Sequence, residues 1–372
     1  LMKRFFSYII LSFFLLLLPT GQASANNNDS IRLSLLTCAP GEEIYSLFGH
    51  TAIRYENPSQ GIDVVFNYGL FSFNTPNFIF RFSLGETDYQ LGATDYERFA
   101  AEYAFFGRSV WQQTLNLTDE EKTELIRLLQ ENYRPENRVY RYNFFYDNCA
   151  TRPRDKIEES IAGKVIYPAE PQDGSLTFRD IVHQYCKGHP WARFGIDLCI
   201  GNEADRPITQ RQMMFAPFYL MDAFDGAQIK GDSIQRPLIT TNELVVDATP
   251  EPDESDWMPT PLQYSLLLFI LTTAATIYGI RRRTGLWGID LFLFGIAGIV
   301  GCVLAFLALF SQHPAVSSNF LLLVFHPGQL LFLPYIIYCV RKGKKCWYLA
   351  LNLVVLTLFI VLFPVIPQRF DF

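Results

Sequence analysis

The chain is poor in charge, in histidine and in closely paired cysteines, and each shortage argues against a class of function. Charged residues make up 18% of the 372 residues and the net charge is -6, so we expect no nucleic-acid partner. There are only five histidines and no CxxC pair, and His183 near Cys186 lacks further closely spaced ligands. We therefore expect no metal ion, and we predict no cofactor.

Apolar residues are abundant, at 49% of the chain, and they are unevenly distributed. Residues 1–25 resemble an export signal, with two basic residues, an apolar core and a small-residue cleavage site. An uncleaved anchor is the alternative, and it leaves the next domain on the same side of the membrane. Residues 26–247 are mixed, acidic and rich in aromatics, and we interpret them as a catalytic domain. Residues 248–261 form an acidic, proline-containing linker.

Residues 262–372 contain four apolar segments, each long enough to cross a bilayer. Basic clusters at 281–283 and 341–345 separate the first segment from the second and the third from the fourth, so the positive-inside rule places both clusters in the cytoplasm. We predict an all-α, four-span domain in the cytoplasmic membrane, with residues 26–247 outside the cytoplasm. The segments lie near 262–280, 289–310, 320–340 and 347–366.

Two histidines lie in this apolar part. His313 belongs to the loop between the second and third spans, which we expect on the outer side with the catalytic domain. His326 precedes a Pro-Gly pair within the third span, where a polar residue is costly. It either serves the function or hydrogen-bonds a neighbouring helix.

The domain at 26–247 has the pattern of an α+β fold. A turn at 57–61 joins two predicted strands into a hairpin that brings Asn67 close to His50. The capping box at Thr118 opens a helix. The apolar patch at 213–221 is either core or a wall that contacts lipid. Strands are predicted at 31–37, 50–55, 62–69, 78–84, 109–117 and 138–146, helices at 96–106, from 119, at 152–161 and at 175–185, and one or two helical turns at 42–48.

Cys149 is the strongest candidate for a nucleophile. It follows an aromatic run and precedes the helix predicted at 152–161. Unpaired N–H groups and the helix dipole at such a junction favour a thiolate and can hold an oxyanion. His50 is the candidate base, and Asn67 is the candidate group that orients it, as in a catalytic triad. Cys38 is the rival nucleophile, but no clear helix begins behind it.

Four more residues are candidates for contact with the substrate or the oxyanion, and packing within the fold is the alternative for each. They are Asn148, Arg54, Tyr142 and Arg152. In an exported domain, Cys186 and Cys199 can also form a local disulfide.

Two motifs resemble the periplasmic domain of Lnb-type lipoprotein N-acyltransferases. The first contains His50, in Phe48-Gly49-His50-Thr51-Ala52-Ile53-Arg54, and the second contains Cys149, in Tyr142-Asn143-Phe144-Phe145-Tyr146-Asp147-Asn148-Cys149-Ala150-Thr151-Arg152. The layout of an exported domain followed by four spans extends the resemblance to nearly the whole chain. The His-before-Cys order is also similar to the circularly permuted papain-like (NlpC/P60-like) fold, in which relatives of lecithin:retinol acyltransferase use a thioester.

The resemblance implies an acyltransferase with a phospholipid donor. Cys149 would take the acyl chain as a thioester and pass it to the N-terminal amine of a diacylglyceryl-cysteine lipoprotein. His50 would first accept the thiol proton and then assist the leaving alcohol. Two other classes stay open. A membrane-anchored cysteine peptidase or amidase acting on cell-wall peptide would use the same dyad without needing four spans. A non-catalytic lipid-binding module would need neither residue.

Overall fold

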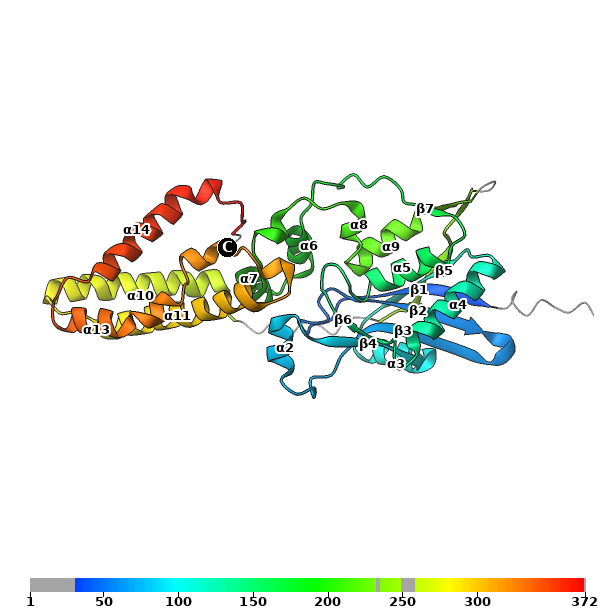
Figure 1. Ribbon diagram of the computed structural model, residues 1–372, viewed down its shortest axis with the longest axis horizontal. Helices are drawn as coiled ribbons and strands as arrows, with labels where there is room; N and C mark the ends of the chain where they lie inside the picture. Colours follow the sequence, from blue (N-terminus) through cyan, green and yellow to red (C-terminus); the bar gives the residue numbers. More distant parts are fainter. Residues whose placement is uncertain (1–30, 232–234, 249–257, 371–372) are drawn as a thin grey trace, which may run out of the picture.

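The computed structural model describes residues 31–231, 235–248 and 258–370. A sheet-containing domain and an elongated helical bundle lie end to end (Figure 1). The predicted signal at 1–25 and most of the predicted linker at 248–261 lie outside the described residues.

A seven-stranded antiparallel sheet forms the centre of the N-terminal domain, with strand order β10-β5-β1-β2-β3-β4-β6. Ala52 pairs with Asn67 across the predicted hairpin, and this confirms the expected approach of Asn67 to His50. The strands are β1 (Arg32–Cys38), β2 (His50–Asn57), β3 (Ile62–Leu70), β4 (Asp88–Asp95), β5 (Val110–Leu115), β6 (Val139–Arg141) and β10 (Ile239–Val246).

Both faces of the sheet are buried under helices, which explains why β1 is apolar on both sides. Leu33 and Leu35 point to the face covered by α4 (Asp119–Tyr133), α5 (Thr151–Ser160) and α9 (Pro217–Asp225). Leu36 and Cys38 point to the other face, which α3 (Tyr96–Phe105) covers. The predicted capping box is present at Thr118. The helices predicted at 96–106 and 152–161 are confirmed as α3 and α5.

The prediction of one or two helical turns at 42–48 is confirmed for one turn, in which the Leu47 N–H donates to the Glu43 carbonyl at 3.1 Å. Two other local predictions are wrong. Residues 78–84 form helix α2 (Phe78–Leu84) instead of a strand. The strand predicted at 138–146 ends at Arg141. Beyond it the chain forms a loop in which Asn143 and Asp147 exchange two backbone hydrogen bonds of 3.0 and 2.9 Å. Asn143 favours this turn because its side-chain oxygen accepts from two backbone N–H groups inside it.

A second core lies between the sheet and the bundle. It includes Phe145, Phe178 and Phe215, and α6 (Phe178–Tyr185) and α7 (Pro190–Cys199) pack around it. Most of the patch at 213–221, which includes the first turn of α9, is buried in the protein interior. This favours the interpretation of the patch as core over a wall that contacts lipid. Cys186 and Cys199 are free thiols, so the structure does not contain the disulfide considered for them. The remaining short elements are β7 (Lys164–Ile166), β8 (Gln228–Lys230), β9 (Gln235–Pro237), η1 (Pro58–Gln60), η2 (Asn202–Asp205) and α8 (Gln210–Met213).

Three helices of the bundle are long and apolar enough to cross a membrane: α10 (Pro261–Arg282), α11 (Trp287–Phe310) and α14 (Trp347–Leu362), which η5 (Phe363–Val365) extends. The third predicted span lies at 320–340, and there the chain is broken into η4 (Phe320–Leu323), α12 (Gly328–Leu331) and α13 (Leu333–Arg341). A short 3-10 turn, η3 (Pro314–Val316), precedes it. This segment is therefore not one continuous helix.

The break packs closely against α11. A Cβ atom at Gly301 would lie 2.5 Å from the carbonyl carbon of His326, and one at Gly298 would lie 2.5 Å from the nitrogen of Leu330. The side chain of Gln329 donates to the Val324 carbonyl at 3.2 Å and to Asn352 at 2.6 Å. The irregular backbone is thus supported inside the bundle, as a membrane requires.

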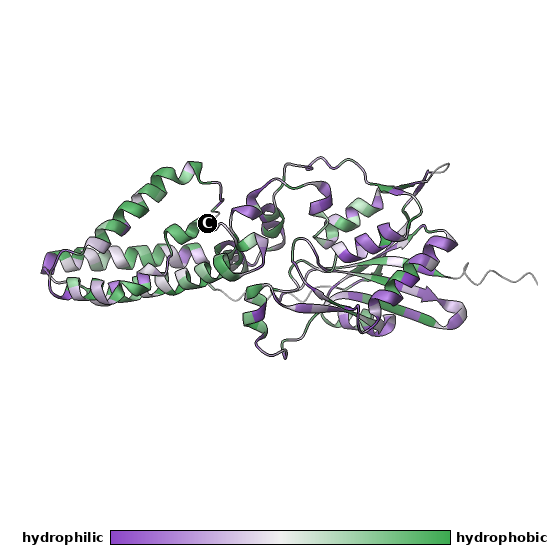
Figure 2. Ribbon diagram, in the orientation of Figure 1, coloured by the Kyte–Doolittle hydropathy of each residue, from purple (hydrophilic) through white to green (hydrophobic). Residues whose placement is uncertain are grey.

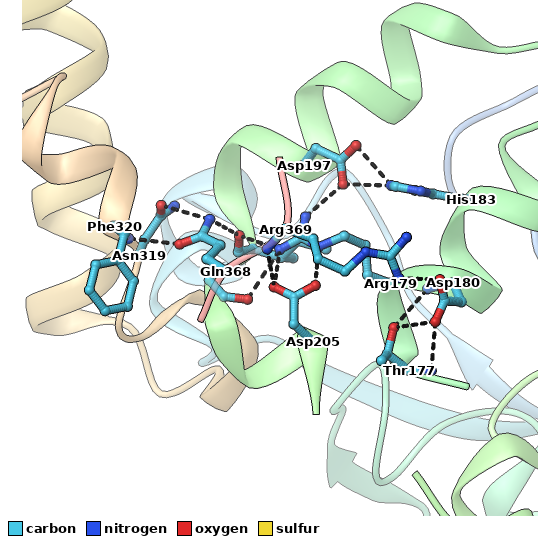
Figure 3. Close-up of polar contacts among 12 residues, drawn as sticks. Thr177, Arg179, Asp180, His183, Asp197, Asp205, Asn319, Phe320, Gln368 and Arg369 are labelled. Atoms are coloured by element: carbon cyan, nitrogen blue, oxygen red, sulfur yellow. Dashed lines mark hydrogen bonds and ion pairs between the residues drawn. The ribbon is translucent and has the colours of Figure 1, made fainter. Parts of the chain in front are cut away.

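A buried polar cluster joins the bundle to the N-terminal domain (Figure 3). Arg179 of α6 is fully buried and forms ion pairs of 2.7 Å with Asp197 and with Asp205. Near the C-terminus, Arg369 pairs with Asp180 and its backbone N–H donates to Asp205. Asn319, in the loop that follows α11, donates to the Leu198 carbonyl at 2.8 Å. The connections after α10 and after α13, which carry the basic clusters, lie at the opposite end of the bundle (Figure 1).

Candidate functional site

Asn148 shapes the turn that presents Cys149. Its side-chain oxygen accepts from the backbone N–H groups of Ala150 and Thr151 at 2.8 and 2.9 Å, at the start of α5. Its amide nitrogen donates to the carbonyls of Phe144 and Phe215 at 2.8 and 2.9 Å. These bonds use both ends of the buried amide. The Asn148 side chain is therefore held within the turn that carries Cys149, and its contact with substrate or the oxyanion stays a prediction.

The Cys149 thiol lies beside the His50–Thr51 peptide at the beginning of β2. Burial raises the pKa of this thiol to about 11, although the N–H groups of Thr51 and of Cys149 itself partly oppose the shift. The expectation that the helix start yields a thiolate is therefore wrong for the resting site, because desolvation is the larger effect. Gly69 makes room for the thiol. It has φ +90°, and a Cβ atom there would lie 3.4 Å from Cys149 Cβ.

His50 is neutral and is oriented by Asn67. Its Nε2 lies 3.3 Å from Asn67 Oδ1, while the Asn67 amide nitrogen donates to the Val65 carbonyl at 3.4 Å. This network assigns the proton of the imidazole to Nε2 and leaves Nδ1 as the acceptor. Burial and, to a smaller extent, the charge of Arg108 together lower the pKa of His50 to about 4, and the hydrogen bond to Asn67 partly opposes them.

Cys38 pairs directly with His50 across β1 and β2, so the rival thiol is also close to the base. It is fully buried, and burial raises its pKa to about 12, above that of Cys149. The hydroxyl of Tyr103 forms a hydrogen bond to its sulfur. Cys38 is therefore the less accessible and the less acidic of the two thiols.

Tyrosine rings line the other side of Cys149. Tyr142 stacks on Tyr89 with ring centroids 4.2 Å apart, and burial raises the pKa of both phenols. The added Cβ at Gly69 would lie 3.7 Å from the Tyr142 ring and 3.9 Å from the Tyr140 hydroxyl. The Tyr140 hydroxyl is buried and has no hydrogen-bond partner among the described residues. Burial also raises its pKa, so it keeps its proton and can donate a hydrogen bond.

The two arginines predicted to contact substrate lie in different places. Arg152 stacks 3.5 Å above the ring of Tyr140 and forms a bidentate ion pair with Asp147 at 2.6 and 2.8 Å. These contacts hold the Tyr140 ring in place. Arg54 lies four residues along β2 from His50, about 13 Å at the usual strand rise. Its guanidinium is held by Asp63 at 2.8 and 2.7 Å. The structure thus does not bring Arg54 to the thiol.

The sequence did not predict three groups that act on the candidate site. They are the Thr51 N–H beside the thiol, the unpartnered Tyr140 hydroxyl and the charge of Arg108, which lowers the pKa of His50. Tyr140 lies two residues before Tyr142, so strand periodicity places both on one face, and that signal was available. Arg108 follows a left-handed Gly107 after α3, and no motif indicates its role. Among the residues that the structure describes, no group of three or more His, Cys, Asp or Glu side chains could hold a metal ion.

Two family models match the chain. The model described as Lnb N-terminal periplasmic domain matches residues 21–183, and the model described as Lnb transmembrane domain matches residues 253–372. The chain belongs to the Lnb family. This Lnb-family protein is accordingly a membrane protein with a periplasmic domain, and His50, Asn67 and Cys149 all lie within the first match. Neither a search of curated proteins nor a search of solved structures found a significant match.

Proposed function

We propose that this Lnb-family protein is a lipoprotein N-acyltransferase of the bacterial inner membrane. In this proposal a phospholipid donates an acyl chain to Cys149, and the resulting thioester is resolved by the N-terminal amine of a diacylglyceryl-cysteine lipoprotein. The observation that carries the proposal is the arrangement of Cys149, His50 and Asn67 in a domain that is fastened to a membrane bundle. The match of both parts of the chain to Lnb domains supports it.

The first half-reaction starts from a neutral pair. Cys149 transfers its proton to Nδ1 of His50 as the sulfur attacks the ester carbonyl of the phospholipid, and a tetrahedral intermediate forms. The unpartnered Tyr140 hydroxyl is suited to donate to the new oxyanion. The C–O bond then breaks, and His50 returns the proton to the leaving lysophospholipid alcohol. The enzyme is left with an acyl thioester and a neutral imidazole.

The second half-reaction uses the same groups. The neutral amine of the lipoprotein attacks the thioester carbonyl, and His50 accepts a proton from this nitrogen. The C–S bond breaks, the sulfur takes the proton from His50, and an amide is released. Because the pKa of His50 is about 4, the imidazole is unprotonated and ready to act as a base in both steps near neutral pH.

The attachment to the bundle gives acyl transfer a physical rationale. Donor and acceptor both carry acyl chains that stay in the bilayer, so a site held at the membrane surface meets them far more often than a free domain would. Desolvation of the half-buried Cys149 thiol also limits access of water to the thioester. A peptidase acting on cell-wall peptide would gain nothing from either effect.

The direct test incubates the purified full-length protein with phospholipid vesicles and a synthetic diacylated lipopeptide. Mass spectrometry should detect a lipopeptide with one additional amide-linked acyl chain. The Cys149→Ala variant should form none, and the Cys38→Ala variant should retain activity. Equal product from wild type and Cys149→Ala would refute the mechanism. Release of peptide fragments from cell-wall material, without lipopeptide acylation, would favour the peptidase instead.

A further inference from the structure

Helix α2 lies next to the bundle and is made largely of hydrophobic residues (Figures 1 and 2). Ile79 and Phe80 are 78% and 56% exposed, and Phe82 is also exposed. The ring of Phe80 lies 5.7 Å from that of Phe306, near the end of α11 that faces the N-terminal domain. Gln312, in the loop that follows α11, donates its backbone N–H to the Leu84 carbonyl at 2.8 Å. These contacts hold α2 level with the end of a candidate membrane span.

Apolar side chains continue from α2 toward Cys149; most are exposed, whereas Phe71 is half-buried and Phe78 is buried beneath them. Phe71 stacks on Phe78 at 5.4 Å, and its ring lies 5.0 Å from that of Phe73, which is 63% exposed. Tyr45 lies 5.9 Å from Phe71 and is also exposed. Leu70, the last exposed member, directly follows the glycine that contacts Cys149. We call this set the aromatic patch: Tyr45, Leu70, Phe71, Phe73, Phe78, Ile79, Phe80 and Phe82.

The rings of the patch also reach the wall of the site itself. Phe71 lies 5.1 Å from Tyr89, and Tyr89 stacks on Tyr142, which lies close to Gly69 beside the thiol. Apolar packing is therefore continuous from a membrane-level helix to the wall beside Cys149, with Tyr89 buried within it and Leu70 as the exposed member next to Gly69. The one basic residue of α2, Arg81, is held by Asp88 at 3.1 Å.

Exposed apolar side chains that cluster in this way mark an interaction surface. Helices that lie in the membrane interface bury Trp, Phe and Leu side chains at the boundary between headgroups and acyl chains, and α2 contacts the end of α11 at that level. The continuity of the patch with a membrane span favours a lipid as its occupant over a soluble protein.

We propose that the aromatic patch binds a phospholipid of the adjacent leaflet, with α2 inserted among the headgroups and one acyl chain lying over Phe73 and Tyr45. The ester of that chain then reaches Cys149 without leaving an apolar surface. This inference rests on the proposed function, since it names the route of the donor, but binding can be tested without the chemistry.

The binding test uses the full-length Cys149→Ala protein, which cannot turn the lipid over. A benzophenone amino acid replaces Phe80, Phe73 or, as the control, Ile166. Ile166 is an exposed apolar residue of β7, which lies far from the bundle (Figure 1).

After irradiation in vesicles of phosphatidylethanolamine and phosphatidylglycerol with added diacylated lipopeptide, mass spectrometry identifies the adducts. Phospholipid adducts at Phe80 and Phe73, several-fold above Ile166, are expected. Equal adducts at all three positions, or lipopeptide adducts alone, would overturn the proposal.

The kinetic test uses the active protein. Phe73→Ser and Phe80→Ser should each raise KM for vesicle phospholipid by about 10-fold, since each removes one exposed aromatic contact, and kcat should change little. Ile166→Ser should change neither. Unchanged KM in both patch variants would refute the donor route. Phospholipid adducts from an enzyme that never acylates lipopeptide would instead refute the proposed function and leave the binding surface in place.

Discussion

Replacing Asn67 with aspartate should move the acid limb of the pH–rate profile upward. In the native site a neutral amide oxygen lies 3.3 Å from His50 Nε2, and burial holds the pKa of the imidazole near 4. Asn67→Asp puts a carboxylate of nearly the same shape at this distance. The negative charge stabilises the imidazolium, so the pKa of His50 rises.

The size and sign of the effect follow from this geometry. An opposite charge within hydrogen-bond distance shifts a pKa by about 1–3 units, so the limb should move from near pH 4 to about pH 5–7. His50 acts as a base and must be unprotonated. Activity is therefore present above the His50 pKa and is lost as the pH falls through it. At pH 5 the wild type should stay active while Asn67→Asp loses about half of its activity or more.

The assay measures kcat/KM for the phospholipid donor, from lysophospholipid release, between pH 4 and pH 9, because this ratio reports the groups of the free enzyme and the ester carries no amine that titrates. Asn67→Ala is the matched control. It removes the hydrogen bond without adding charge, and should cost about 10-fold in rate at every pH without raising the limb. An Asn67→Asp limb that coincides with the wild-type limb would refute the assignment of His50 as the base oriented by Asn67.

Three further changes test other parts of the structure. Tyr140→Phe should lower kcat by about 100-fold with little change in KM or melting temperature if the hydroxyl donates to the oxyanion, and an unchanged kcat would exclude that role. Arg179→Met leaves two buried aspartates without their cation. The free energy of unfolding, measured with denaturant, should fall by about 3–5 kcal/mol. The control, Arg211→Met, removes a half-exposed ion pair and should lower it by less than about 1 kcal/mol, so equal losses would contradict the argument from burial. Gly301→Ala places a methyl group against the broken segment and should lower the free energy of unfolding by about 1–3 kcal/mol. In Gly288→Ala the methyl group meets open space, so Gly301→Ala should have the lower melting temperature of the two in detergent.

Local signals predicted the part of the site that lies on the sheet. The turn at 57–61 closes the β2–β3 hairpin, and its register alone brings Asn67 to His50. The helix behind Cys149 was predictable because Pro153 is tolerated only in a first turn. Neither inference needed knowledge of distant parts of the chain.

The errors arose where tertiary contacts override local preference. Residues 78–84 are aromatic and favour a strand, but they form α2 beside the end of α11. The protonation state of Cys149 depends on how much of the fold covers it, and no sequence window reports that burial. The third apolar segment is long enough to span a membrane as one helix, yet Pro327 and Gly328 break it where Gly301 of α11 gives it space.

The central claim is that Cys149 carries the acyl chain. The full-length protein is incubated with phospholipid and no acceptor, quenched in acid, digested and analysed by mass spectrometry for an acyl group that neutral hydroxylamine removes. We predict a thioester on the peptide that contains Cys149, and we predict its disappearance when the diacylated lipopeptide is added. An acyl group found on Cys38, or on no cysteine while lipopeptide is still acylated, would contradict the claim.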